Sequence, residues 1–275
     1  MWVKLILALM FGLLCAGAVH FAPRRERALL GAQTQASAAL RLLTWNIGYA
    51  ELEEDTRAHT KDLPSVAETI LRAEPDAVAL QELTGAPQLN ALVALLHGRY
   101  RGAVAQAGQS DRFEAVLVRD AGARFAPVAA GARYALSATF RPRAEAAEVV
   151  LLSAHADAFN AARRRVYTEA LVDWAQERAP SSMVFIAGDF NFELRAGDET
   201  NLYTDNLQHD SESYSYLLRY FNDLGRAAGD TAINDRRIDY IFGQNNELHV
   251  RRAEVLRTAA VGRMDHWPLL VEVEW

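Results

Sequence analysis

The sequence contains a single cysteine, Cys15, among its 275 residues. One thiol per chain excludes a disulfide framework, a zinc site built from several cysteines and an iron–sulfur cluster within the chain. Because Cys15 lies in an apolar N-terminal run, the rest of the chain also lacks a cysteine nucleophile. Only eight prolines and 16 glycines are present, which excludes a collagen-like or low-complexity chain.

Several loop motifs that bind phosphate or carry a nucleophile are absent. The sequence has no G-x-S-x-G elbow, no G-x-x-x-x-G-K loop and no G-x-G-x-x-G turn after a strand. An excess of positive charge is also lacking, since 29 Lys and Arg stand against 35 Asp and Glu, a net charge of −6. Residues 1–40 carry +3 and residues 41–275 carry −9, so the main part of the chain has no general basic coat for long nucleic acids.

The N-terminal segment is basic and apolar. The run from Leu5 to Val19 follows Lys4 and precedes a cluster of arginines at residues 24–27. Residues 1–22 have the small-residue pattern of a cleaved secretory signal peptide, and they also have the length and flanking charges of an uncleaved membrane anchor. Both interpretations remain open. We therefore expect a protein that is exported (periplasmic or secreted), or anchored in the membrane through residues 2–22, with residues 23–40 as a linker.

Residues 41–275 alternate between short apolar segments and longer amphipathic ones. The short segments are rich in Val, Ile, Leu and aromatic residues. The predicted strands are Arg41–Ile47, Asp76–Gln81, Ala115–Val118, Val149–Ala154, Met183–Ala187, Ile238–Phe242 and Leu269–Val273. The predicted helices are Leu63–Ala73, Gln88–Leu96, Ala161–Glu177 and Tyr214–Phe221. With no internal repeat and no second linker, the pattern predicts one mixed α/β domain over residues 41–275.

Polar side chains stand at the ends of several predicted strands. They are Asn46, Glu82, His155, Asp189, Asn191, Asp239, Asp265 and His266. One such residue is ordinarily a cap or loop residue. Because open sheets bring strand ends to a common edge, so many of them without a competing motif favour one shared functional site.

These residue types restrict the chemistry of such a site. Glu and Asn supply hard oxygen ligands, which suit Mg²⁺, Mn²⁺ or Ca²⁺ rather than a zinc cage. Asp189 and Asn191, two residues apart, point the same way if strand geometry persists. Two histidines can carry charge or move protons near neutral pH, and Asp239 can orient one imidazole. A divalent ion, a positioned water and an imidazole together favour hydrolysis of a phosphoester.

Five short motifs now stand in a recognisable order: TWNI at 44–47, LQE at 80–82, GDFN at 188–191, RIDYIF at 237–242 and DHWP at 265–268. In this order the chain resembles the endonuclease/exonuclease/phosphatase superfamily, over essentially all of residues 41–275. Its members include pancreatic-type deoxyribonucleases, apurinic endonucleases, neutral sphingomyelinases and inositol polyphosphate 5-phosphatases. The resemblance implies a four-layer α/β sandwich, in which two mostly antiparallel sheets lie face to face with helices outside and the site at one edge.

The resemblance also implies roles for the individual residues. The implied metal ligands are Glu82, Asn46 and Asp265. The implied catalytic residues are His155, Asp189, Asn191, Asp239 and His266. Asp189 resembles the residue that activates or orients water, and Asn191 resembles one that helps to hold the phosphate. Asp239 resembles the partner of His266, and which histidine is acid and which is base stays open. The implied cofactor is Mg²⁺, with Mn²⁺ or Ca²⁺ as alternatives.

Two motifs depart from the family pattern. Met264 stands where the last motif usually begins with Ser, so any hydroxyl contact there is lost. The segment around His155 reads Ser-Ala-His-Ala at 153–156 instead of a sequence like Asn-Thr-His-Leu. The second departure weakens the resemblance at His155.

The expected activity is divalent-metal-dependent hydrolysis of a phosphoester, as in a phosphodiesterase or nuclease, by a monomer. The substrate class stays open among nucleic acid, phospholipid and small phosphate esters, and lipid or inositol phosphatase activity is an alternative to nuclease activity. A non-catalytic binding module on the same fold is a further alternative. We predict that Arg163–Arg165 form an exposed helix face rather than a phosphate clasp, because acidic residues follow on the same helix. Residues 201–216 are predicted to be a surface loop.

Overall fold

The computed structural model describes residues 39–48, 62–107, 112–143, 146–194, 204–244, 248–257 and 264–275. The chain divides into two units, residues 1–37 and 38–275, and all described residues belong to the second. The predicted leader and nearly all of the predicted linker lie outside the described residues, so those two predictions stay predictions. Among the helices of the described ranges, none is both long and apolar enough to cross a bilayer.

One six-stranded sheet is built from the two ends of the domain. Its strand order is β11-β12-β1-β2-β4-β3. The strands are β1 (Ala39–Asn46), β2 (Ala77–Leu83), β3 (Arg101–Gln106), β4 (Phe113–Val118), β11 (His249–Val255) and β12 (Leu269–Glu274). Strands β1 and β2 are parallel, and every other neighbouring pair in this sheet is antiparallel.

The second six-stranded sheet uses the middle of the chain, in the order β5-β6-β7-β8-β10-β9. Its strands are β5 (Arg124–Ala130), β6 (Arg133–Phe140), β7 (Val149–His155), β8 (Met183–Asp189), β9 (Phe221–Asp223) and β10 (Asp239–Gln244). Here β7 and β8 form the parallel pair, and the other neighbours are antiparallel.

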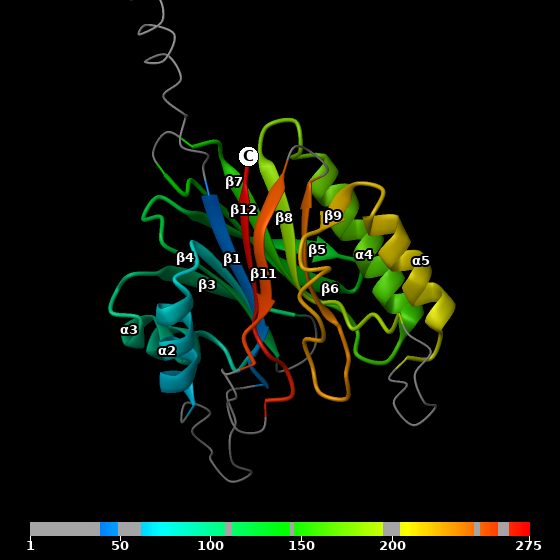
Figure 1. Ribbon diagram of the computed structural model, residues 1–275, viewed down its shortest axis with the longest axis horizontal. Coiled ribbons are helices and arrows are strands. Elements are labelled where there is room, and N and C mark those ends of the chain that lie inside the picture. Colours follow the sequence, from blue (N-terminus) through cyan, green and yellow to red (C-terminus); the bar gives the residue numbers. More distant parts are fainter. Residues whose placement is uncertain are drawn as a thin grey trace, which may run out of the picture. The chain divides into compact units, whose positions relative to one another are not determined.

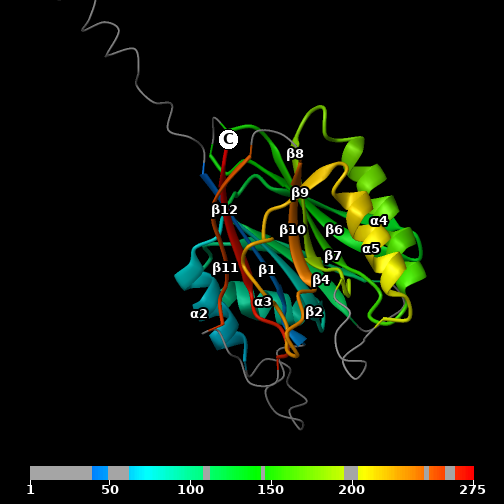
Figure 2. The same ribbon diagram turned by 45° about the vertical axis from the view of Figure 1, so that its right-hand side comes forward.

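The two sheets repeat one topology that the sequence does not display. The strands of β1-α2-β2-α3-β3-β4 are arranged β1-β2-β4-β3, and those of β7-α4-β8-α5-β9-β10 are arranged β7-β8-β10-β9. The helices are α2 (Leu63–Ala73), α3 (Ala86–Leu95), α4 (Ala161–Gln176) and α5 (Leu207–Leu217). Helices α2 and α3 cover the first sheet and α4 and α5 cover the second, as Figures 1 and 2 show. The predicted four-layer sandwich is confirmed.

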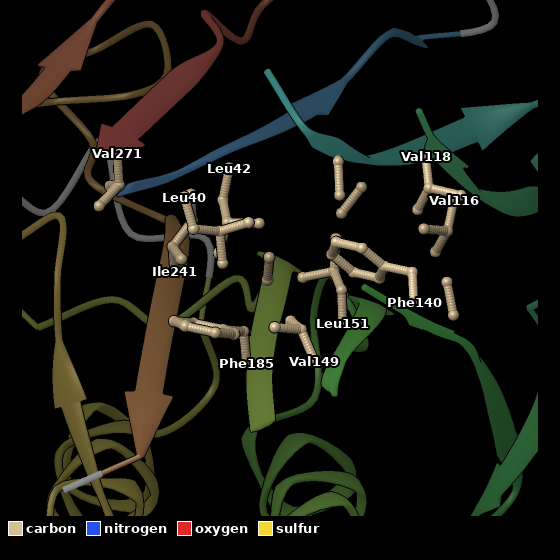
Figure 3. Close-up of a cluster of buried hydrophobic side chains, with 14 of the residues drawn as sticks. Leu40, Leu42, Val116, Val118, Phe140, Val149, Leu151, Phe185, Ile241 and Val271 are labelled. Atoms are coloured by element: carbon tan, nitrogen blue, oxygen red, sulfur yellow. The ribbon is translucent and has the colours of Figure 1, made fainter. Parts of the chain in front are cut away.

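Successive side chains of a strand point to opposite faces of its sheet, and in this way they fill the three interfaces between the four layers. In β1, Leu40 and Leu42 point between the sheets, whereas Leu43 and Trp45 point toward α2 and α3. All four are fully buried. Figure 3 shows how aliphatic and aromatic side chains from both sheets, including Phe185, meet between them. This burial of apolar surface is the main source of stability for the two-sheet arrangement.

All the predicted elements are present, but the last helix, α5, has other bounds than predicted. Each of the seven predicted strands overlaps a strand of the structure, and three predicted helices match α2, α3 and α4 within two residues or less. The prediction of a helix at Tyr214–Phe221 was wrong, because α5 runs from Leu207 to Leu217 and Phe221 begins β9. The prediction of a surface loop over residues 201–216 was therefore wrong for the part within α5. Asn206 caps α5 by accepting hydrogen bonds from the backbone amides of Gln208 and His209.

The five strands that the sequence did not predict are β3, β5, β6, β9 and β11. Four of these, all except β6, lie at the edges of the two sheets. Edge strands bury less of each face, and β11 begins with four exposed residues. Without a continuous apolar run or a clean alternation, such segments carry little sequence signal.

Arg164 corrects the prediction that Arg163–Arg165 form one exposed face. Its side chain is fully buried and forms a bidentate ion pair with Asp210, with Nε–Oδ1 and Nη2–Oδ2 distances of 2.7 and 2.8 Å. Arg163 and Arg165 are exposed, as predicted, and pair with acidic residues. The buried pair joins α4 to α5, which explains why a charge lies on the inner face of α4.

Gly188 is required by the close approach of β7 and β8. It pairs with Ala154 in the parallel ladder, and a Cβ at this position would lie 1.8 Å from the Ala154 carbonyl oxygen. We expect Gly188→Ala to lower the free energy of unfolding by about 2 kcal/mol or more, because backbone must move to admit the methyl group. Urea unfolding measures this. Gly122→Ala, where the nearest atom is a side-chain oxygen at 3.3 Å, is the matched control, and an equal loss in both variants would contradict this account.

Glu114 should make the stability of the domain depend on pH. The side chain is fully buried, and burial raises its pKa well above the usual 4.5, with Arg133 opposing this. The folded state therefore keeps a proton that the unfolded state releases, so stability is complete below pH 4.5 and is lost as the pH rises. We expect Glu114→Gln to be more stable than the wild type at pH 8. The difference in the free energy of unfolding between the two proteins should shift in favour of the variant by about 1–3 kcal/mol from pH 5 to pH 8. Parallel pH–stability curves for the two proteins would rule this out.

Candidate active site

The polar strand ends converge at one edge of the sandwich. The parallel strands β1, β2, β7 and β8 all end there. Strands β10 and β12 are antiparallel to β8 and β1, so they begin at that edge. Asp189 pairs in register with His155 on one side and with Asp239 on the other. The topology thus brings residues more than 200 positions apart in the chain to one place.

Glu82 lies near the end of β2, at an irregularity in the pairing of β2 with β4. The register with β4 shifts between Leu80 and Leu83, and Glu82 has a positive φ of 59°. This left-handed backbone is costly for a residue other than Gly and is typical of functional sites. The Glu82 carboxylate is mostly buried, with 14% of the side chain exposed, and lies 2.6 Å from Nη1 of Arg112. The same carboxylate oxygen, Oε1, lies 3.7 Å from Nε2 of His155.

The Asp189 carboxylate is held from both sides. Asn46 donates its amide Nδ2 to Oδ2 at 3.1 Å, and the backbone amide of Asn191 donates to Oδ1 at 2.9 Å. Burial raises the pKa of Asp189 and the negative charge of Asp239 adds to this, while His266, His155 and the Asn46 bond oppose it. Both oxygens of Asp189 are therefore oriented, and the carboxylate is more basic than a solvated one.

His266 and Asp239 form a buried pair. Nδ1 of His266 lies 2.8 Å from Oδ2 of Asp239, and Nε2 of His266 lies 3.7 Å from Oδ2 of Asp189. Burial alone would lower the pKa of His266, but the charges of Asp239 and Asp189 outweigh it and raise the pKa from its usual 6.5 to about 10. The imidazole is therefore a cation at neutral pH. Trp45 fixes its backbone by donating Nε1–H to the His266 carbonyl at 3.1 Å.

His155 is the opposite case. Burial lowers its pKa from 6.5 to about 4, and the positive charges of Arg133 and Arg112 add to this, whereas Asp189 opposes it. Its Nε2 lies 3.7 Å from both Glu82 and Asp189. The site thus holds two histidines that differ in charge at neutral pH, one neutral and one protonated.

The backbone of His155 is fixed by two residues that the sequence did not single out. The backbone amide of His155 donates to the Tyr167 hydroxyl at 3.2 Å, and Arg133 donates to the His155 carbonyl at 2.8 Å. Tyr167 comes from α4 and Arg133 begins β6, so no local pattern around His155 indicates either contact.

Beneath the site a polar bridge joins the two sheets. Gln81 donates Nε2 to the Ser153 hydroxyl at 3.0 Å, and Ser153 in turn donates to the Leu80 carbonyl at 3.1 Å. Gln81 and Ser153 are fully buried. Polar residues within otherwise apolar strands were the available signal for them, and a buried polar pair that is fully satisfied fixes how the sheets align.

Seven of the eight predicted site residues are linked by the contacts above. Asp265 differs: its side chain is 57% exposed, and its Oδ1 lies 3.8 Å from Nε2 of His266. Its role as a metal ligand stays a prediction. Met264, where the family pattern has Ser, is partly buried and packs against the core beneath α2 and α3.

One group of these residues could hold a metal ion by geometry alone. Asp189, Asp239 and His266 each offer a ligand atom, and these atoms lie within 4.8 Å of one another. The predicted ligand Glu82 is outside this group. A charged His266, with Nδ1 already bonded to Asp239, offers no free lone pair, so the chemistry of this group favours proton handling.

The charge on His266 can be tested directly. In protein freed of metal with EDTA, we expect its NMR titration to show a pKa of about 10 and Asp239→Asn to move it down toward 6.5, because the larger attractive charge is lost. His266→Gln assigns the resonance. Since the folded pKa is raised, the stability that this pair contributes is complete below pH 6.5 and is lost as the pH rises through about 10. An unchanged titration in Asp239→Asn would contradict the pairing.

The fold is that of a class of phosphoesterases, and the site contains a buried group of two aspartates and a histidine that could bind a metal ion. Residues 43–264 match the Endonuclease/Exonuclease/phosphatase family, and the chain belongs to that family. Members of this family generally hydrolyse phosphoester bonds and typically depend on a divalent metal. A comparison with curated proteins found no match.

Solved structures of the same fold come from several organisms. An endonuclease/exonuclease/phosphatase from Beutenbergia cavernae is 20% identical, with a TM-score of 0.67, covering 86% of this chain and 71% of that one. The mannosyl-6-phosphatase Bt3783 of Bacteroides thetaiotaomicron is 18% identical, with a TM-score of 0.62, covering 86% and 100%. The human Nocturnin catalytic domain with bound sulfate is 17% identical, with a TM-score of 0.63, covering 86% and 93%. At these identities the likeness shows the fold alone.

Proposed function

We propose that this protein is a divalent-metal-dependent phosphoester hydrolase, with a positioned water attacking phosphorus in line with the leaving oxygen. The proposal rests on the two contacts of the His266 ring. Its Nδ1 lies 2.8 Å from Oδ2 of Asp239, and its Nε2 lies 3.7 Å from Oδ2 of Asp189. These contacts join a charged imidazole to an oriented carboxylate at the edge where Glu82 lies. Such a pair can move protons on both sides of a reacting phosphate.

Glu82 and Asn46 are the proposed metal ligands, with Asp265 as a further one. The Glu82 carboxylate already pairs with a cation, the Arg112 guanidinium, at 2.6 Å, so its surroundings favour positive charge. Carboxylate and amide oxygens are the ligands that Mg²⁺, Mn²⁺ and Ca²⁺ prefer. When bound, such an ion supplies a Lewis acid that polarises a phosphoryl oxygen. The residues present fit that role.

Asp189 is the proposed base. Its two hydrogen bonds from Asn46 and Asn191 fix the carboxylate plane, and its raised pKa makes it a better proton acceptor. The Asn191 side chain lies at the same edge and donates to the Ala156 carbonyl at 3.5 Å. We propose that this amide also contacts the phosphate.

His266 and His155 have different proposed tasks because their charges differ. Protonated His266 can stabilise developing negative charge on the phosphate or donate a proton to the leaving oxygen. Neutral His155 cannot donate as an imidazolium at neutral pH, so it can bind the phosphate or accept a proton. This difference in charge favours His266 as the acid.

The substrate class follows from charge only in part. The acidic net charge of residues 41–275 argues against tight binding along long DNA, while a bound divalent ion would still attract a single phosphate group. We therefore propose that the substrate is a small phosphate ester or the end of a nucleic acid, in preference to a long duplex. Lipid or inositol phosphates are the alternative within the class.

A metal-supplemented assay tests the proposal. We expect hydrolysis of bis-p-nitrophenyl phosphate or DNA to stop with excess EDTA and return with Mg²⁺. Glu82→Gln and His266→Gln should each lower kcat/KM by about 10²-fold or more, since each removes a group acting on the reacting phosphate. Glu212→Gln, an exposed residue on α5 paired with Arg165, is the control. Turnover that ignores EDTA would overturn the metal dependence, and turnover unaffected by both site variants would mean that the site is misassigned. Absence of turnover with every divalent metal tested would favour the non-catalytic binding module.

A further inference from the structure

Arg112 forms an ion pair with Glu82, the carboxylate that we propose as a metal ligand. Its Nη1 lies 2.6 Å from Oε1 of Glu82, and 39% of its side chain is exposed. The backbone at Arg112 is fixed, because its carbonyl accepts a hydrogen bond from the Ala107 amide at 3.0 Å. A guanidinium is charged at every physiological pH, so Arg112 cannot end this contact by losing its proton.

We propose that Arg112 is an exchange residue: it neutralises Glu82 when no metal is bound, and it turns to the substrate phosphate when a divalent ion takes its place. This inference rests on the proposed function and deepens it. Arg112 and a divalent cation would compete for the same carboxylate, that of Glu82. The ion carries twice the charge, so it displaces the guanidinium without any change in protonation.

The displaced guanidinium would remain beside the site. The positive charge of Arg112 already acts on His155, where it helps to lower the pKa, and Nε2 of His155 lies 3.7 Å from the same Glu82 oxygen. From this position a guanidinium can bind two phosphate oxygens at once. Metal binding would thus also create an anion subsite beside His155.

Arg133 shows why Arg112 is the suitable residue. Arg133 also acts on His155, but it donates to the His155 carbonyl at 2.8 Å, and its side chain is 28% exposed. Moving it would release the backbone of a site residue. The ion pair of Arg112 with Glu82 runs from side chain to side chain, so ending that ion pair breaks no contact with the backbone of a site residue.

Metal and phosphate binding to the full-length protein test the exchange without any turnover. By isothermal titration calorimetry, we expect Arg112→Gln to bind Mn²⁺ about twofold to fivefold more tightly than the wild type, because a competing ion pair is removed. With Mn²⁺ saturating, inorganic phosphate should bind about tenfold more weakly to Arg112→Gln. Arg112→Lys should recover part of the competition with Mn²⁺ and little of the phosphate affinity, since an ammonium lacks the bidentate geometry.

Arg124→Gln is the matched control, because Arg124 begins β5 in the second sheet and forms an ion pair with Glu148 at 2.9 Å, whereas Glu82 belongs to the first sheet. It should change neither affinity. If Arg112→Gln keeps the wild-type melting temperature but binds Mn²⁺ no more tightly than the wild type, the exchange is wrong, whereas the metal site still stands. A wild type that binds no Mn²⁺, or Glu82→Gln that binds it as tightly as the wild type, would overturn the metal site and the exchange with it.

Discussion

The parallel pairing at the centre of each sheet is the constraint on which the rest of the structure depends. Two parallel strands need a crossover connection, which α2 supplies between β1 and β2 and α4 between β7 and β8. The crossovers place helices outside the sandwich, and the parallel strands end at one edge. Their antiparallel neighbours must then begin there, so the positions of Asp239 and His266 follow from the same pairing.

The candidate site concentrates features that work against stability. Glu82 and Asn191 have positive φ angles, and Asp189, Asp239 and His266 are buried ionisable groups. Each is tolerated because its surroundings hold it: Asp239 neutralises His266, and Asn46 satisfies Asp189. Strain and buried charge that persist only with such support are typical of a site selected for chemistry rather than for packing.

The central strands and the polar strand ends were predictable, and the sheet edges were not. Strands β1, β7 and β8 are buried on both faces, so their sequences are nearly continuous apolar runs. The edge strands bury too little to leave such a pattern. Helix α5 was misplaced because its polar first turn carries little apolar periodicity, although Asn206 as its cap was a readable signal.

The sequence by itself determined which residue types stand at the strand ends, and their order matched a family whose fold the structure confirms. Only the tertiary structure decided how these residues act on one another. Burial lowers the pKa of both histidines. At His266 the charges of Asp239 and Asp189 outweigh burial, whereas at His155 two arginines add to it and Asp189 opposes it only in part. The partners reach the site from other parts of the chain: Arg133 from β6, Tyr167 from α4 and Arg112 from the residue before β4. Electrostatic fields and hydrogen bonds depend on distance in space rather than along the chain.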